Sequence, residues 1–195
     1  MEAFLVSTGV VALAEIGDKT QLLSLLLAAR YKRPWPIILG IFIATLLNHA
    51  LAGAVGAWIA AVLGPDLLRW LLGLSLLAMA VWILIPDNVD DVDATPAGLR
   101  FGVFGVTFIA FFLAEMGDKT QIATVALAAR YDMLLAVIVG TTLGMLIANV
   151  PAVLLGDVAA RKLPIRAVHA VAALIFAGLG VSILAGFGAE ALAIG

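Results

Sequence analysis

The sequence predicts an all-α integral membrane protein whose six transmembrane helices form two inverted three-helix repeats. Three observations predict this fold class. Of the 195 residues, 64% are hydrophobic and only 12% are charged, whereas soluble domains carry roughly 25% charged residues. Six apolar segments are long enough to cross a bilayer, and the first half of the chain recurs in the second half at an offset of 100 residues.

The six apolar segments follow one another with short connections. Each needs roughly 20 residues to cross about 30 Å of hydrocarbon. The predicted spans are 3–29, 35–63, 67–85, 101–129, 133–159 and 166–187. The first span lacks a basic region before its apolar run, which continues to Ala29, so we expect a retained transmembrane helix rather than a signal peptide.

The longest connection separates the two halves of the chain. It covers residues 86–100 and contains Asp87, Asp90, Asp91 and Asp93. Acidic runs of this kind are typical of solvated segments, so we interpret it as a linker and not as a binding site. The predicted organisation is therefore a first repeat over 1–85, an acidic linker over 86–100 and a second repeat over 101–195.

An internal repeat supports this division. Residues 14–31 recur as residues 114–131, with 12 of 18 positions identical. A three-helix unit begins and ends on opposite sides of the membrane, so the second unit must enter from the side opposite the first. The two halves are therefore predicted to be inverted repeats, a common architecture of secondary transporters.

The basic residues of the connections predict the orientation. Seven lie on one side and only two, Arg69 and Arg130, on the other. The seven are Arg30, Lys32, Arg33, Arg100, Arg161, Lys162 and Arg166. The positive-inside rule places these seven and the acidic linker in the cytoplasm and both termini outside. Without an Arg-rich leader, the expected location is a bacterial inner (plasma) membrane.

Four acidic residues lie near the middle of the predicted first and fourth spans. They are Glu15, Asp18, Glu115 and Asp118. An acidic residue at a helix centre costs at least about 2.5–3.5 kcal/mol on insertion scales, so such residues are usually functional. Residues three apart share a helical face, and inverted repeats place their sites at the midplane. We therefore expect the four carboxylates to converge there.

Two lysines, Lys19 and Lys119, accompany these acids. Four carboxylates and two ammonium groups leave a charge of −2, which one divalent cation would neutralise, and the lysines are predicted to be counter-ions. A structural alternative is that Glu15 and Glu115 pair with Lys19 and Lys119 along their own helices. The repetition of the whole motif at one depth favours the functional interpretation.

Oxygen ligands dominate the predicted site. The chain has no cysteine, so thiolate ligands and disulfides are excluded. Carboxylate, amide and hydroxyl oxygens suit Ca2+, Mg2+ or Mn2+. Secondary ligand candidates are Thr20, Gln21, Thr120 and Gln121. Gly17 and Gly117 permit either close helix approach or local unwinding that frees carbonyls, and both possibilities remain open.

Three further polar residues lie near the middle of the second and fifth spans: Asn48, His49 and Asn149, which aligns with His49. Such residues more often form helix–helix hydrogen bonds, but they are retained as secondary site candidates. His49 could also relay protons, because imidazole titrates near neutral pH. Four tryptophans, at positions 35, 58, 70 and 82, are interpreted as interfacial anchors.

Several functional classes lack support. There is no basic stripe with interleaved aromatics, so nucleic-acid binding is not expected. No HExxH or GxSxG motif is present, so the protein is not expected to be an enzyme. No prosthetic group is predicted, the partners being lipid, a divalent cation and protons. Nothing in the sequence indicates an oligomeric state.

The segments Glu15–Thr20 and Glu115–Thr120 resemble the duplicated signature of a family of small cation/proton exchangers. Its members include Golgi and chloroplast manganese and calcium transporters and bacterial manganese exporters. The resemblance implies Mn2+ or Ca2+ as substrate, proton antiport as the energy source and the motif acids as ligands. It favours manganese export by alternating access. Export of cationic amino acids or other organic cations, or a non-transporting membrane scaffold, remain alternatives.

Overall fold

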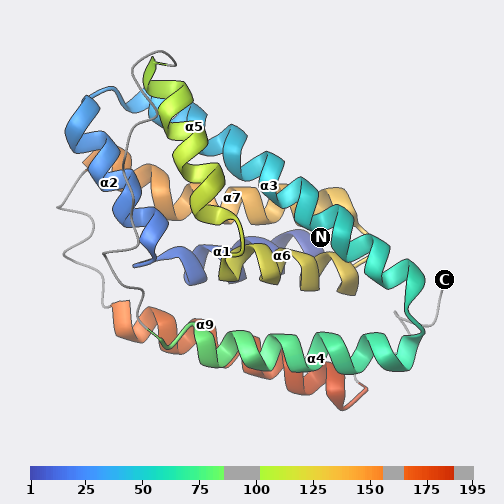
Figure 1. Ribbon diagram of the computed structural model, residues 1–195. Helices are drawn as coiled ribbons and strands as arrows, with labels where there is room; N and C mark the ends of the chain where they lie inside the picture. The colour runs from blue at the N-terminus through green and yellow to red at the C-terminus, as the bar shows by residue number, and fades with distance from the viewer. Residues whose placement is uncertain (86–101, 156–164, 187–195) are drawn as a thin grey trace.

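The computed structural model describes residues 1–85, 102–155 and 165–186 (Figure 1). Within these ranges the chain is helical and contains no β-strand, which confirms the all-α prediction for the described residues. The predicted acidic linker at 86–100 lies outside them. The last residues of the predicted fifth and sixth spans also lie outside, together with Arg100, Arg161 and Lys162.

Eight helices occur in the described residues. They are α1 (Glu2–Glu15), α2 (Lys19–Tyr31), α3 (Pro34–Val62), α4 (Pro65–Trp82), α5 (Gly102–Glu115), α6 (Lys119–Arg130), α7 (Leu134–Leu155) and α9 (Ile165–Leu184). Each helix of the first half begins 100 residues before one of the second half. The sequence repeat at that offset is therefore also a repeat of the positions at which helices begin.

Four helices, α3, α4, α7 and α9, are long and apolar enough to cross a membrane. The other two predicted spans differ from the expectation of one helix each. Each consists of two shorter helices, α1 with α2 and α5 with α6, separated by three residues at positions 16–18 and 116–118. The polar motif lies at these interruptions, where backbone groups are not committed to a helix.

Close packing around α3 and α7 follows the repeat. Gly40 of α3 lies against α5, where an added Cβ would be 2.8 Å from Cβ of Thr107. Its counterpart Gly140 of α7 lies against α1, where an added Cβ would be 2.7 Å from the carbonyl oxygen of Phe4. Figure 1 shows α3 and α7 beside these broken helices. Small residues permit this approach of helix backbones.

The third helices of the two halves, α4 and α9, pack side by side below the other helices in Figure 1. Gly73 and Gly180 face each other in this contact: an added Cβ on Gly180 would be 2.9 Å from the carbonyl oxygen of Gly73. Leu184 also packs over Gly73. The α4–α9 pair therefore forms one unit made from both repeats.

Two hydrophobic cores flank the broken helices, and they differ in composition. The first contains buried residues of α1, α4, α6 and α9, with one from α7, among them Val10, Leu76, Leu127 and Phe176. The second contains buried residues of α2, α3 and α5, with one from α7, among them Leu27, Ile41 and Phe111. The second core contains no buried residue of α4 or α9 among the described residues.

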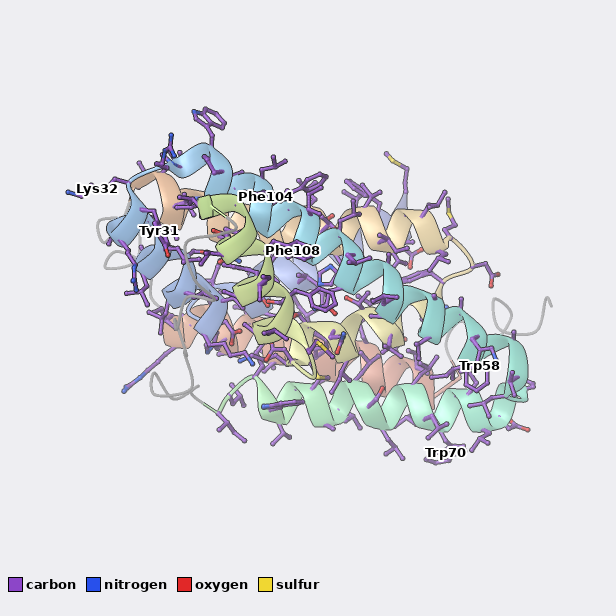
Figure 2. The ribbon with its side chains drawn as sticks, turned by 45° about the horizontal axis from the view of Figure 1, so that its top comes forward. Tyr31, Lys32, Trp58, Trp70, Phe104 and Phe108 are labelled. Atoms are coloured by element: carbon purple, nitrogen blue, oxygen red, sulfur yellow. The ribbon has the colours of Figure 1, made fainter. Side chains whose placement is uncertain are left out.

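The tryptophans lie on the outside of the molecule. All four are exposed, and Figure 2 shows Trp58 and Trp70 at the end opposite Tyr31 and Lys32. Trp35 is the second residue of α3 and Trp82 is the last residue of α4. These positions fit the predicted role at the two membrane interfaces.

Candidate functional site

The residues that interrupt each broken helix form a tight turn. Ile16 has φ −65° and ψ 114°, and Gly17 has φ 85°. The Asp18 N–H donates to the Glu15 carbonyl over 3.0 Å. These are the features of a type II β-turn, which requires glycine or asparagine at its third position. The sequence had left open the role of Gly17, and the structure assigns it to local unwinding.

The second repeat builds the same turn. Gly117 has φ 77°, and the Asp118 N–H donates to the Glu115 carbonyl over 3.1 Å. In both repeats a glutamine closes the turn from the next helix. The Gly17 N–H donates to Gln21 Oε1 over 2.9 Å, and the Gly117 N–H donates to Gln121 Oε1 over 2.8 Å.

The two glutamines also connect each turn to the other repeat. Gln21 Nε2 donates to the carbonyl of Ala148 on α7 over 3.0 Å. Gln121 Nε2 donates to Oδ1 of Asn48 on α3. Both Gln carbonyl oxygens therefore accept from the turn, and both amides bind the opposite half, so these side chains hold the turns in place.

The glutamates of the motif end their helices. Glu15 is the last residue of α1 and Glu115 the last residue of α5, and both are fully buried. Thr20 Oγ1 donates to Glu15 Oε2 over 2.5 Å, and Thr120 Oγ1 donates to Glu115 Oε2 over 3.0 Å. Helix C-termini carry partial negative charge and favour cations. The two glutamates thus present oxygen atoms where a cation is stabilised.

Ion pairs join the two repeats. Lys19 Nζ lies 2.8 Å from Asp118 Oδ1, and Lys119 Nζ lies 2.5 Å from Asp18 Oδ1. The described ion pairs of the motif therefore run between repeats and not along one helix. Each lysine faces the aspartate of the other half, which brings the two turns together at one place.

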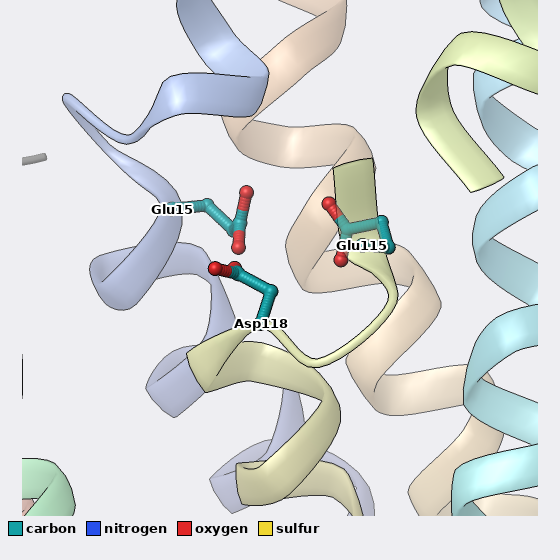
Figure 3. A group of neighbouring side chains, drawn as sticks. All are labelled: Glu15, Glu115 and Asp118. Atoms are coloured by element: carbon teal, nitrogen blue, oxygen red, sulfur yellow. The ribbon is translucent and has the colours of Figure 1, made fainter. Parts of the chain in front are cut away.

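Three carboxylates come close to one another. One oxygen atom from each of Glu15, Glu115 and Asp118 lies within 4.8 Å of the other two. Figure 3 shows these side chains pointing toward one another from the two turns. Ca2+ binds oxygen ligands at about 2.3–2.6 Å, so ligands around one ion lie up to about 5 Å apart. The spacing suits a single divalent cation.

Asp18 is also buried and lies beside Lys119, but it does not belong to this group of three carboxylates. Oε1 of Glu15 and Oε1 of Glu115 are buried without a hydrogen-bond partner in the described part of the chain. Buried polar atoms in proteins are normally satisfied by a partner, water or an ion. The two glutamates are therefore the groups that a bound cation or proton would satisfy.

The secondary candidates on α3 and α7 surround the turns in different ways. Asn48 Nδ2 donates to the Phe112 carbonyl of α5 over 3.2 Å. Ser24 of α2 donates to Asn149 Oδ1 over 2.7 Å. These are helix–helix hydrogen bonds of the kind expected for polar residues in spans. His49 is fully buried, and neither ring nitrogen has a hydrogen-bond partner among the described residues.

Two residues of α9 reach the first turn, and the sequence did not single them out for this contact. Ile165 lies over Gly17, and His169 Nε2 is 2.7 Å from the carbonyl oxygen of Ile16. The offset of 100 aligns His169 with Arg69 of α4, which gives no signal of such a contact. Only the packing of α9 reveals it.

Comparison with known proteins identifies similar chains. The family model described as "Divalent cation/proton antiporter GDT1" matches residues 3–91 and again residues 103–190. The two matches correspond to the two halves that share helix boundaries. No solved structure matches this chain.

Individual relatives cover most of the chain. A Vibrio cholerae protein named "Putative manganese exporter" is 56% identical over 177 residues, which are 90% of this chain and 87% of that protein. "GDT1-like protein 3" of Oryza sativa is 31% identical over 93% of this chain and 73% of its own length. "Divalent cation/proton antiporter GDT1" of Saccharomyces cerevisiae is 25% identical over 90% and 81%.

Proposed function

Because this chain belongs to the GDT1 family of divalent cation/proton antiporters, we propose that it exports Mn2+ through a site formed by Glu15, Glu115 and Asp118. The observation that carries the proposal is the convergence of these three carboxylates within 4.8 Å. They come from two turns that the chain repeats 100 residues apart. Hard oxygen ligands suit Mn2+ and Ca2+, and the similarity to the Vibrio cholerae protein named for manganese favours Mn2+.

The ion pairs determine which acids carry a charge that no lysine neutralises. Lys119 faces Asp18 and Lys19 faces Asp118, so the positive and negative charges of these two pairs cancel. Glu15 and Glu115 then carry the remaining charge of −2 when both are ionised. One divalent cation neutralises the two glutamates, and so do two protons. The protein therefore exchanges two protons for one divalent cation, without net charge movement.

Competition for the same carboxylates couples the two fluxes. A buried pair of ionised glutamates without a cation is costly in a low-dielectric site. The site is therefore stable with a cation bound or with protons bound, and unstable with neither. Thr20 and Thr120 hold one oxygen of each glutamate, which leaves the other oxygen to bind the cation or the proton.

Alternating access requires two arrangements of the halves around this site. The repeat of helix boundaries at an offset of 100 residues supports two inverted three-helix units with six spans. In this scheme each broken helix counts as one span, and the turns lie near the bilayer midplane, as in other transporters with discontinuous helices. The seven basic residues of the sequence support an orientation with the α2–α3 connection in the cytoplasm and both termini outside.

Transport in inverted membrane vesicles tests the proposal. An acidic vesicle lumen should drive Mn2+ uptake by the unmodified protein. Glu115→Gln should lower the uptake rate by more than about 100-fold, because loss of a residue that only supports a metal ligand already lowers affinity or activity by about 10–100-fold. The matched control is Glu2→Gln, an exposed acid at the start of α1. Uptake by Glu115→Gln at the rate of the control would refute the assigned site.

The charge balance can be tested separately. Because two protons replace one divalent cation, an imposed membrane potential without a pH gradient should leave Mn2+ uptake unchanged. A clear dependence of the initial rate on a potassium diffusion potential would contradict the exchange of two protons for one cation. It would leave the location of the site unaffected, because the number of protons does not depend on which carboxylates bind the metal.

A further inference from the structure

The first turn is covered by the beginning of α9. An added Cβ on Gly17 would lie 2.5 Å from Cγ2 of Ile165, so α9 approaches the turn as closely as glycine allows. One helical turn further along α9, His169 Nε2 lies 2.7 Å from the carbonyl oxygen of Ile16. A carbonyl can only accept, so the imidazole donates this hydrogen bond. The carbonyl is one that the interruption of the helix has freed.

Within the described residues the second turn has no such cover. An added Cβ on Gly117 would meet nothing within 4 Å, and 57% of Met116 is exposed. The residue that aligns with His169 is Arg69 of α4, which lies 3.6 Å from Asp66 of the same helix. One repeat therefore has its turn held by the third helix of the other repeat, and the reciprocal contact is not made.

The hydrophobic cores show the same asymmetry on a larger scale. The α4–α9 pair packs with α1, which leads into the first turn, and with α6, which leads out of the second turn. The second core, formed by α2, α3 and α5 with one residue of α7, contains no buried residue of the pair within the described ranges. If the two repeats exchange their conformations, α1 and α6 are replaced in this contact by their counterparts α5 and α2. The repeat thus defines a second arrangement, with the pair packed on α2 and α5.

We propose that His169 is a positioning residue that fixes the first turn while α9 covers it, and so couples the position of the α4–α9 pair to the cation site. Glu15 directly precedes Ile16, so the bond from His169 holds the backbone beside a proposed ligand. In the second arrangement this bond is absent and the beginning of α4 covers Gly117. The proposal rests on the proposed transport function, because only a transporter needs both arrangements.

Thiol labelling can test this coupling, because the chain contains no cysteine. Ile16→Cys and Met116→Cys would be prepared singly, each combined with native His169, His169→Leu or His169→Gln. The proteins would be reconstituted in lipid nanodiscs, where a membrane-impermeant maleimide reaches both faces. Labelling after denaturation gives the full extent for each variant. Mn2+ transport by the unmodified protein would be measured in parallel, in inverted membrane vesicles.

We expect the Met116→Cys variant to label faster than the Ile16→Cys variant when His169 is present. Loss of the hydrogen bond in His169→Leu should raise labelling at position 16 by about three-fold and lower it at position 116, because the population shifts toward the second arrangement. His169→Gln keeps an N–H donor and should restore both rates. This opposite change at two positions is what a merely structural role would not produce.

Each other outcome overturns the proposal. Unchanged labelling at both positions in His169→Leu would show that the contact has no influence on the turns. A rise at both positions would indicate local loosening without coupling, and absence of labelling at position 16 in every background would exclude the second arrangement. Failure of the unmodified protein to transport Mn2+ would instead refute the proposed function, whatever the labelling pattern.

Discussion

The two turns of this protein have the same internal chemistry and different surroundings. Each has glycine at positive φ, a glutamate held by a threonine and a glutamine that closes the turn. The first turn is covered by α9, whereas no described residue covers the second at Gly117. The ion pairs differ in the same way: 1% of the side chain of Lys119, which reaches Asp18 of the covered first turn, is exposed, against 24% for Lys19, which reaches Asp118 of the second turn.

This difference separates two functions of the structure. The parts that are alike in both turns either contact the glutamates, as the threonines do, or hold the turn in shape, as the glutamines do. Under the proposed function these shared parts determine what binds. The parts that differ belong to the α4–α9 pair, since α9 covers the first turn and α4 does not cover the second. Under the proposed second arrangement this pair determines from where the site is reached. A transporter with alternating access needs an unchanged site and an exchangeable cover. In our proposal these two roles belong to different helices.

Removing each lysine in turn should show the largest asymmetry. Lys119→Met removes the ammonium group beside fully buried Asp18, and loss of one partner of a buried ion pair costs about 3–5 kcal/mol. Lys19→Met should cost less, because water reaches part of that side chain. Free energies of unfolding in detergent would measure both. Equal destabilisation would mean that the two ion pairs are equally shielded from water, and it would contradict the difference between the two turns.

Alanine at the two turn glycines should give the next largest difference. Both substitutions force a Cβ into positive φ, which costs about 1–2 kcal/mol. Gly17→Ala also clashes with Ile165, which adds about 1–3 kcal/mol of overpacking, whereas Gly117→Ala meets none of the described residues within 4 Å. Thermal unfolding would measure the stabilities.

The double variant Gly17→Ala with Ile165→Ala provides the control for this clash. It should recover stability relative to Gly17→Ala once the cost of Ile165→Ala alone is subtracted. Additive effects of the two substitutions would show that α9 does not press on the first turn. That result would also weaken the evidence that the two turns have different covers.

The shared chemistry of the turns predicts equal effects for another pair of substitutions. Thr20→Val and Thr120→Val keep the side-chain shape and remove the hydroxyl that donates to Glu15 or Glu115. Hydrogen bonds to charged groups contribute about 1.5–3 kcal/mol, and both variants should weaken Mn2+ binding to a similar extent. Isothermal titration with Mn2+ would measure this, and a large effect in one repeat alone would contradict equivalent glutamates.

The sequence predicted the parts of the molecule that repetition reveals. The offset of 100 residues located both motifs, and the composition indicated an all-helical chain. It predicted that Lys19 and Lys119 are counter-ions of the acids, but it did not reveal that Lys19 faces Asp118. The one partner that spacing along a helix specifies is Glu15, the structural alternative. The turn at Gly17 was one of two possibilities, since glycine serves unwinding and close packing alike.

The contact between His169 and Ile16 could not be predicted, because it depends on how α9 packs and not on local pattern. The repeat even argues against it, since the aligned residue Arg69 makes a different contact. A sequence repeat describes what two halves have in common. A transporter in one conformation departs from that symmetry, so its asymmetric contacts are the ones that only three-dimensional packing supplies.

The smallest predicted difference lies at the ends of α2 and α6. Arg30 lies over Tyr31 and Arg130 over Tyr131, but only Tyr131 also donates a hydrogen bond, over 3.2 Å, to Glu2 in the described residues. Partial burial raises the pKa of Tyr131 above its ordinary value of 10.0, and the negative charge of Glu2 raises the pKa further.

A raised pKa means that the folded protein retains a proton that the unfolded chain loses above about pH 10. This contribution is complete below pH 10 and is lost as the pH rises through the folded pKa. The unmodified protein should therefore lose stability above pH 10 more steeply than Tyr131→Phe, whereas Tyr31→Phe should follow the unmodified protein. Unfolding midpoints between pH 8 and 11 would measure this. Identical slopes for all three proteins would mean that Glu2 does not distinguish the second tyrosine from the first.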